Sequence, residues 1–205
     1  LKELIDKNRI RELPTEAATQ KITAWDLGMS DSTAIWVAET ISGEIRVMDF
    51  YEASGESLDH YIAWLDEKGY RDYTHIMPHD VNVRELQTGK SRYQFLTEAG
   101  LEIDVAPKSS VEDGIQAVRR ILPSCWFNKD KTRSGVECLQ NYRRVFNEKT
   151  SSFQNRPLHD WSSHAADAFR YLALGMDTAG NGARTDWSKP FETTVDGDSY
   201  KDYYV

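Results

Sequence analysis

The sequence predicts one α/β domain built on a mixed β-sheet. Three β-rich runs separated by Gly- and Ser-containing turns come first, and strands alternating with helical patterns follow them. Helical patterns come last, before a tail without periodicity. This order favours an antiparallel front part of the sheet, parallel later strands, and flanking helices. At 205 residues the chain can form one domain with a substantial core.

Residues 1–20 predict a short helix and a polar linker, because a few apolar side chains are spread among charges before Leu13-Pro14. The chain begins at Leu1 and not at a methionine. We therefore expect residues 1–20 to lead from an upstream domain of a longer protein.

The predicted strands are β-branched and aromatic runs that end at turn residues. Residues 28–32 and Ser42-Gly43 supply the turns of an antiparallel meander, and Pro107 follows the last strand. We expect strands at residues 21–27, 33–38, 44–53, 74–79 and 101–106.

The predicted helices follow from apolar residues at helical spacing. Gly69 is suited to cap the first helix, and Ser109 or Ser110 begins the third. We expect helices at residues 58–68, 93–100, 111–122, 135–146 and 161–176. The domain therefore covers residues 21–177, and residues 178–205, which lack periodicity, predict a flexible tail with aromatic residues that could dock on a partner.

Composition limits the classes of function. The formal net charge of -8 argues against a broad nucleic-acid-binding surface, but it leaves room for local basic patches. Cys125 and Cys138 match neither a disulfide framework nor a zinc motif, so we expect reduced thiols in a cytosolic setting. We expect neither a signal peptide nor a membrane helix, which needs roughly 20 apolar residues.

Three aspartates stand beside apolar runs. Asp26 closes a predicted strand, Asp80 closes another, and Asp167 lies inside the last predicted helix. A carboxylate among buried neighbours is costly unless it is hydrogen-bonded, paired or bound to a metal. Three of them on separate elements suggest a shared metal site. A turn residue bound to its own backbone is the alternative for Asp26 and Asp80, and a phosphate-binding hairpin is a further one for Asp26.

The last predicted helix is apolar nearly all round, which is typical of a helix buried on both faces. Asp167 therefore faces the interior, among alanines at 165, 166 and 168 that permit close packing. The alternative is an acid favoured near a helix N-terminus, although Asp160 or Ser162 is better placed for that. His164, three residues earlier, shares its face and could orient the carboxylate, bind a metal or move a proton. A capping or surface histidine is equally open.

Mg²⁺ and Mn²⁺ prefer carboxylate oxygens, and two such ions about 3.5–4 Å apart can flank a phosphodiester. The sequence has no competing zinc set, P-loop or nucleophile elbow. Basic residues that could contact phosphates follow Asp80 and the fifth strand. They are Arg84, Lys90, Arg92 and Lys108. Residues 129–133 contain another basic cluster, which we interpret as solvated surface.

Residues 21–176 resemble the nuclease domain of phage terminase large subunits. The resemblance rests on Trp25-Asp26-Leu27-Gly28, on His79-Asp80 after a strand, and most specifically on the run from His159 to Tyr171, His-Asp-Trp-Ser-Ser-His-Ala-Ala-Asp-Ala-Phe-Arg-Tyr. It implies a ribonuclease H-like fold and two divalent metal ions, Mg²⁺ or Mn²⁺, held by an acidic triad. By position the triad is Asp26, Asp80 and Asp167.

The resemblance also implies endonucleolytic cutting of concatemeric viral double-stranded DNA during genome packaging in the host cytoplasm. Portal protein and the small terminase subunit would be partners, and residues 1–20 would lead from a missing ATPase domain. Three alternatives stay open: a resolvase- or transposase-type core, one lobe of an actin-like ATPase, and a non-catalytic portal-docking module.

Overall fold

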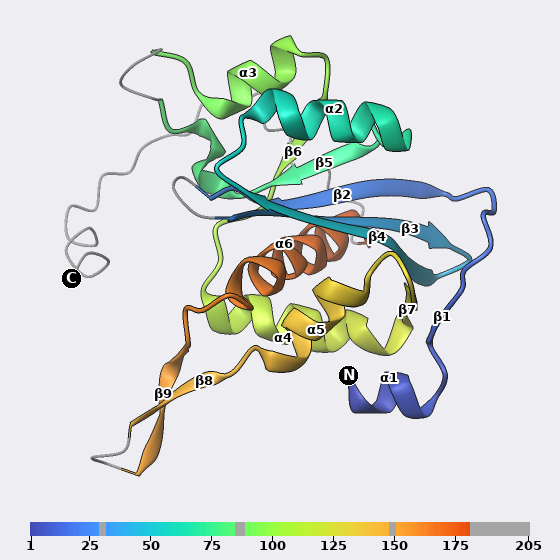
Figure 1. Cartoon of the computed structure of the whole chain (residues 1–205), viewed down its shortest axis with the longest axis vertical. Helices are drawn as coiled ribbons and strands as arrows, with labels where there is room; N and C mark the ends of the chain where they lie inside the picture. Colours follow the sequence, from blue (N-terminus) through green and yellow to red (C-terminus); the bar gives the residue numbers. More distant parts are fainter. Residues whose placement is uncertain (29–31, 85–88, 148–150, 181–205) are drawn as a thin grey trace.

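The structure is a computed structural model that describes residues 1–28, 32–84, 89–147 and 151–180. A seven-stranded sheet lies at its centre, with α2 and α3 on one face and α4, α5 and α6 on the other (Figure 1). The strand order is β1-β7-β4-β3-β2-β5-β6, and β8 and β9 form a separate hairpin. The elements are α1 (Lys2–Asp6), β1 (Ile10–Arg11), β2 (Gln20–Asp26), β3 (Ser32–Ile41), β4 (Glu44–Ser54), α2 (Leu58–Lys68), β5 (Thr74–Met77), η1 (His79–Asn82), α3 (Arg92–Glu98), β6 (Glu102–Val105), α4 (Val111–Ile121), η2 (Leu122–Ser124), β7 (Cys125–Asn128), α5 (Arg133–Asn141), β8 (Arg144–Asn147), β9 (Ser152–Pro157) and α6 (Ser163–Gly180).

The sheet confirms the predicted mixture of antiparallel and parallel strands. β2, β3 and β4 form an antiparallel meander in which Asp26 pairs with Ala34. β5 is parallel to β2, and β6 is parallel to β5. Because β2 and β5 run in the same direction, the residues that follow them emerge at the same edge of the sheet.

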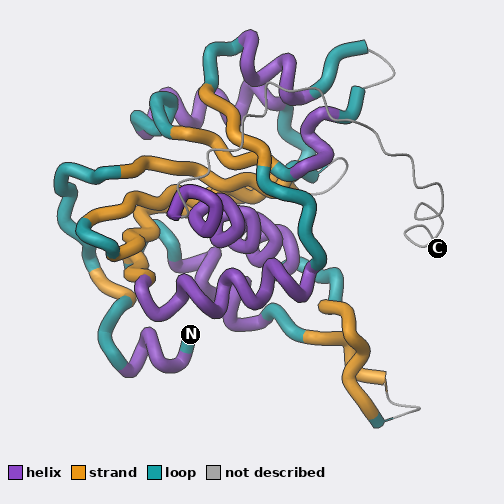
Figure 2. The backbone as a smooth tube through the Cα atoms, turned by 180° about the vertical axis from the view of Figure 1, so that it is seen from behind, coloured by secondary structure: helices purple, strands orange, loops and turns teal. Residues whose placement is uncertain are grey.

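Helix α6 is buried on both sides, as its apolar sequence predicts. It packs between the sheet and helices α4 and α5 (Figures 1 and 2). Ala165, Ala168 and Phe169 are fully buried on the core side, and the indole N–H of Trp36 donates to the carbonyl of Ala165 at 2.7 Å. This bond fixes the first turn of α6 against β3.

The opposite face of the sheet is covered by α2 and α3. Trp25, Tyr61 and Leu65 are central to that core, and Gly69 caps α2 in the left-handed conformation with φ of 75°. His75 is buried beside Thr23, and burial lowers the pKa of His75 to about 4, so it is neutral at physiological pH.

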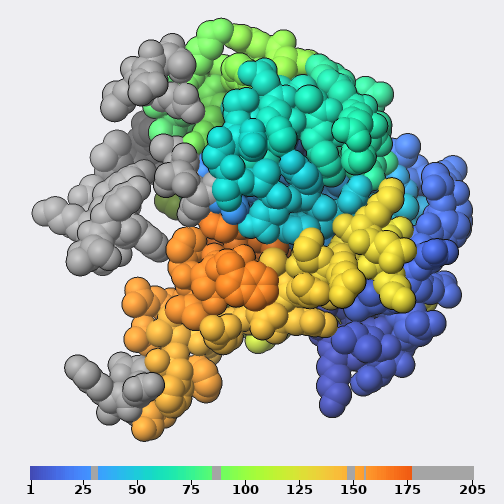
Figure 3. All heavy atoms as spheres, in the orientation of Figure 1, coloured from blue at the N-terminus to red at the C-terminus, as the bar shows by residue number. Residues whose placement is uncertain are grey.

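The predicted helix over residues 135–146 is wrong in its second half. α5 ends at Asn141, Tyr142 is extended, and the chain continues into the hairpin β8–β9, which projects from the body of the molecule (Figure 3). The hairpin is held by cross-strand pairing and by the edge-to-face contact of Phe146 with Phe153. β1 and β7 were not predicted: β1 has only two residues, and β7 lies between the predicted helices at residues 111–122 and 135–146.

Three further expectations concern the cysteines, a membrane helix and the C-terminal tail. Cys125 and Cys138 are buried free thiols, as expected. None of the helices in the described part of the chain combines the length and apolar character of a membrane span. Most of the predicted tail, residues 181–205, lies outside the described residues, and α6 continues to Gly180.

Replacing Gly135 with alanine should destabilise the fold by about 1–3 kcal/mol through overpacking. A Cβ at Gly135 would lie 2.4 Å from Cη2 of Trp36 and 2.7 Å from Cγ of Phe50, and neither ring has room to move in the core. In a helix with free space around the glycine, the same change would raise the free energy of unfolding. The sign of the measured change therefore tests the packing around Gly135. Denaturant unfolding measures it, with the exposed neighbour Ser134→Ala as control. Equal stability of Gly135→Ala and wild type would contradict this packing.

Candidate metal centre

The first turn of α6 meets the end of β2. Asp26, the last residue of β2, has a side chain only 20% exposed, and Nδ1 of His164 donates to its Oδ2 at 3.1 Å. His164 thus links α6 to the end of β2 through Asp26. The bond joins two segments separated by 138 positions in the sequence.

Asp167 lies one turn further along α6 and is 27% exposed. Arg170 donates to its Oδ1 from Nη2 at 2.8 Å and from Nε at 3.2 Å. The hydroxyl of Tyr142, just after α5, donates to the same oxygen at 3.4 Å. The Asp167 carboxylate also keeps the pKa of Arg170 above its ordinary value, although burial opposes this. Asp167 is therefore an ion-paired carboxylate with its partners gathered on one oxygen.

Asp167 acts electrostatically on Asp26, and all three predicted aspartates act on Tyr171. Burial raises the pKa of Asp26, the hydrogen bond from His164 lowers it, and the like charge of Asp167 raises it further. Burial and the charges of all three aspartates raise the pKa of the Tyr171 phenol. The aspartates therefore occupy the same region, around one tyrosine on α6.

Asp80 differs from the sequence expectation. β5 ends at Met77, and Pro78 begins the short 3₁₀ helix η1, which contains Asp80. Because this turn leads the chain out of the sheet, His79 and Asp80 are both exposed. The expectation that Asp80 closes a strand among buried neighbours is wrong. The charge of Asp80 still contributes to raising the pKa of the Tyr171 phenol on α6.

The donor chemistry of the site fits a hard divalent cation, but the described side chains do not form a preassembled centre. Within the described residues, no three His, Cys, Asp or Glu side chains are placed to hold one ion. The contacts above engage Oδ2 of Asp26 and Oδ1 of Asp167, so the second oxygen of each carboxylate is left for a ligand. Carboxylate oxygens are what Mg²⁺ and Mn²⁺ prefer.

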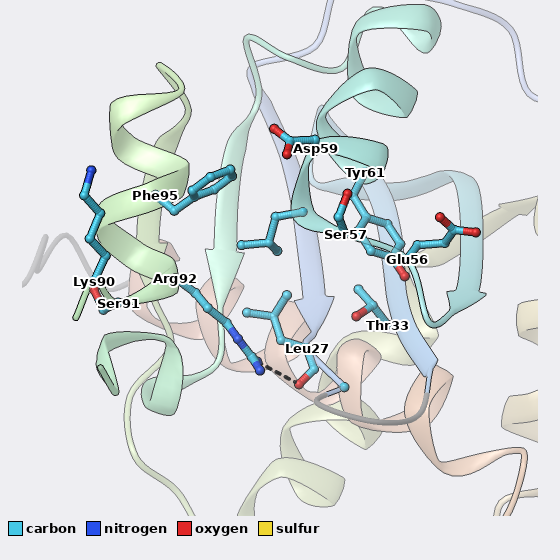
Figure 4. Close-up of a pocket in the computed structure, with 12 residues that line it drawn as sticks. Leu27, Thr33, Glu56, Ser57, Asp59, Tyr61, Lys90, Ser91, Arg92 and Phe95 are labelled. Carbon is cyan, nitrogen blue, oxygen red and sulfur yellow. Dashed lines mark hydrogen bonds between the residues drawn. The ribbon is translucent and has the colours of Figure 1, made fainter. Parts of the chain in front are cut away.

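A cavity of about 620 Å³ lies between the end of β2 and the starts of α2 and α3 (Figure 4). Leu27 and Gly28, which follow Asp26, line it, and none of the three aspartates is among its described lining residues. Arg92 reaches from α3 toward the end of β2, and its Nη1 donates to the carbonyl of Leu27 at 3.3 Å. Glu56 and Asp59 lie on the α2 side. The lining residues are Leu27, Gly28, Thr33, Glu56, Ser57, Leu58, Asp59, Tyr61, Lys90, Ser91, Arg92 and Phe95.

The predicted phosphate-contacting residues are only partly gathered at this cavity. Lys90 and Arg92 line it, and Lys90 pairs with Oε2 of Glu98 at 2.6 Å. Arg84 is exposed and pairs through its backbone with Ser91. Lys108 is exposed in the loop after β6 and does not line the cavity.

Three side chains at the site were not singled out as functional from the sequence. Arg170 and Tyr171 belong to the motif that ends at residue 171, and helical spacing from Asp167 could have indicated both. Tyr142 gives no such signal, because it lies in a stretch whose pattern predicts helix.

The seven-stranded mixed sheet and the helices on its two faces form a ribonuclease H-like α/β fold. The same fold occurs in the nuclease domains of phage large terminases. The P22 large terminase nuclease domain matches with a TM-score of 0.61 at 19% identity, over 83% of this chain and 89% of that one. The SPP1 large terminase nuclease domain with bound Mn matches with a TM-score of 0.56 at 16% identity, over 77% and 86% of the two chains.

The large terminase of the thermophilic bacteriophage D6E, in complex with ATP-gamma-S, matches with a TM-score of 0.65 at 17% identity. The match covers 83% of this chain but only 44% of that one, so this chain spans less than half of the length of that terminase. No protein-family model and no curated protein sequence matches this chain.

Replacing Asp26 with asparagine should leave the metal-free protein as stable as wild type, or more stable, at neutral pH. Burial raises the pKa of Asp26, so the folded protein holds this proton more tightly than the unfolded chain does. Ionisation of Asp26 therefore lowers the free energy of unfolding of the wild-type protein. This decrease begins as the pH rises above 3.8, the ordinary pKa of an aspartate, and is complete above the raised pKa of Asp26. The lower free energy of unfolding persists at neutral pH. Thermal melting in a chelator, from acidic to neutral pH, measures this difference.

In acid below that window the two proteins should converge, because Asp26 is then protonated in both the folded and the unfolded state. A lower melting temperature of Asp26→Asn at neutral pH would contradict the prediction. It would mean that the bond from His164 stabilises more than burial of the charge destabilises.

Proposed function

We propose that this chain is the nuclease domain of a tailed-phage large terminase and that it hydrolyses double-stranded DNA with two divalent metal ions, Mg²⁺ or Mn²⁺. The observation that carries the proposal is the meeting of Asp26 at the end of β2 with His164 and Asp167 on α6. The shared fold supports it, as do bound Mn in the SPP1 domain and bound cobalt in the large terminase nuclease of phage G20c.

Asp26, Asp80 and Asp167 are the proposed metal ligands. His164 holds Asp26 through Oδ2, and Arg170 holds Asp167 through Oδ1, which leaves one oxygen of each carboxylate for binding. Asp80 stands on the exposed turn η1, so it can join the other two without a burial cost. Bound divalent ions would supply an activated water and neutralise charge at the leaving oxygen.

The cavity at the end of β2, next to the residues that follow Asp26, is the proposed approach for the DNA backbone. Arg92 and Lys90 line it, and Arg84 and Lys108 are exposed on the segments that follow η1 and β6. These residues would contact phosphates and position the strand. With a net charge of -8, the domain would gain only modest affinity from them, and a packaging motor that holds the DNA would supply the rest.

The biological setting follows from the same proposal. The chain would act within a longer terminase, with residues 1–20 leading from the ATPase domain. It would cut concatemeric viral DNA during genome packaging in the host cytoplasm. Portal protein and the small terminase subunit would be its partners, and residues 178–205 would belong to the tail that contacts the portal.

Single replacements of Asp26, Asp80 or Asp167 with asparagine should each abolish Mn²⁺-dependent nicking of plasmid DNA. We expect a loss of at least about 100-fold, since even residues that only support metal ligands contribute up to that factor. The matched control is Asp49→Asn, because Asp49 is more buried than any of the three but binds Tyr70 at 3.0 Å, away from the site. Gel assays with Mn²⁺, Mg²⁺ and chelator measure the rates.

Two results would count against the proposal. One is a wild-type chain that neither nicks plasmid DNA nor binds Mn²⁺ by calorimetry. The other is an active chain whose Asp26→Asn and Asp167→Asn variants cut at the wild-type rate.

A further inference from the structure

The side-chain donors that contact the Asp167 carboxylate all bind one of its two oxygens. Nη2 and Nε of Arg170 and the hydroxyl of Tyr142 all converge on Oδ1, at 2.8, 3.2 and 3.4 Å. Three donors hold this one oxygen in place. The second oxygen, Oδ2, accepts none of these bonds, and the charge of Asp167 acts on Asp26 and on Tyr171.

Arg170 is itself fixed by its surroundings. Its side chain is 10% exposed, and helix α4 packs against it at Gly114. A Cβ at Gly114 would lie 3.1 Å from Cδ of Arg170 and 3.2 Å from Nη1, so only a residue without a side chain fits there easily. The guanidinium is therefore confined on the side that faces α4.

We propose that Arg170, assisted by Tyr142, is a positioning residue that orients Asp167 for binding a divalent cation. This inference rests on the proposed metal-dependent function. The guanidinium fork supplies two N–H groups in a fixed geometry, which a lysine ammonium cannot reproduce. Hydrogen-bonding partners of a metal ligand commonly contribute about 10–100-fold to metal affinity.

Charge and orientation act in opposite directions at this position. A guanidinium next to the site repels a cation, so simple removal of the charge would strengthen binding by Coulomb's law. Arg170→Lys avoids this ambiguity, because it keeps the positive charge and removes only the fork. Tyr142→Phe is the second variant, because it removes one donor to Oδ1 and changes no charge.

The experiment is calorimetric titration of the whole chain with Mn²⁺, accompanied by thermal melting. Arg170→Lys should bind Mn²⁺ about tenfold more weakly. Tyr142→Phe should bind it more weakly by a smaller factor. Excess Mn²⁺ should restore plasmid nicking by Arg170→Lys but not by Asp167→Asn. The matched control is Arg46→Lys: the Arg46 side chain is 13% exposed and pairs with Glu16 at 2.9 Å, at the far end of β4, so Mn²⁺ affinity should not change.

Wild-type affinity in Arg170→Lys and in Tyr142→Phe, or tighter binding in either, would overturn the inference. If Arg170→Lys does not fold, Tyr142→Phe decides alone. Asp167→Asn separates this outcome from failure of the proposed function. Loss of Mn²⁺ binding in Asp167→Asn with full binding in Arg170→Lys leaves the metal site standing and refutes only the positioning role. Absence of Mn²⁺ binding in wild type refutes both.

Discussion

The packing of α6 against the sheet is the contact on which the candidate site depends. Its small residues allow a close approach: the indole of Trp36 reaches the carbonyl of Ala165 at 2.7 Å, and a Cβ at Gly175 would lie 2.3 Å from Cδ1 of Ile76. Larger residues at these positions would move the helix away from β3 and β5. Because the helix lies this close, its first turns reach the carboxyl end of β2, and His164 can bond to Asp26. The site is therefore a product of core packing.

Charge compensation explains why the aspartates differ in their surroundings. Asp26 and Asp167 are largely covered, and each accepts hydrogen bonds from a neighbouring side chain, His164 or Arg170, which offsets the cost of burial. Asp80 is exposed on η1 and needs no such partner. The fold thus presents two carboxylates that are held in place and a third that solvent stabilises. In the proposed metal site, the exposed Asp80 would move toward Asp26 and Asp167 when an ion binds.

The sequence predicted the parts of this arrangement that depend on local patterns. The meander from β2 to β4 and the burial of α6 follow from alternation, helical spacing and strand ends. Features that depend on distant partners were not predictable. Tyr142 reaches Asp167 because α5 stops at Asn141. The short strands β1 and β7 pair with each other, and β7 also pairs with β4, so both depend on segments far away in the sequence. The exposure of Asp80 is different, because it follows from the local residue Pro78, which begins a 3₁₀ turn and which the strand predicted over residues 74–79 overlooked.

The central claim is that the end of β2 and the start of α6 form one divalent metal site. A crystal structure of the chain soaked in Mn²⁺, with anomalous scattering recorded at the manganese edge, tests it most directly. The account predicts anomalous density between Asp26 and Asp167, within bonding distance of a carboxylate oxygen of each, with Asp80 drawn toward it. Well-ordered carboxylates with no anomalous density between them at saturating Mn²⁺, or density only elsewhere on the surface, would contradict it.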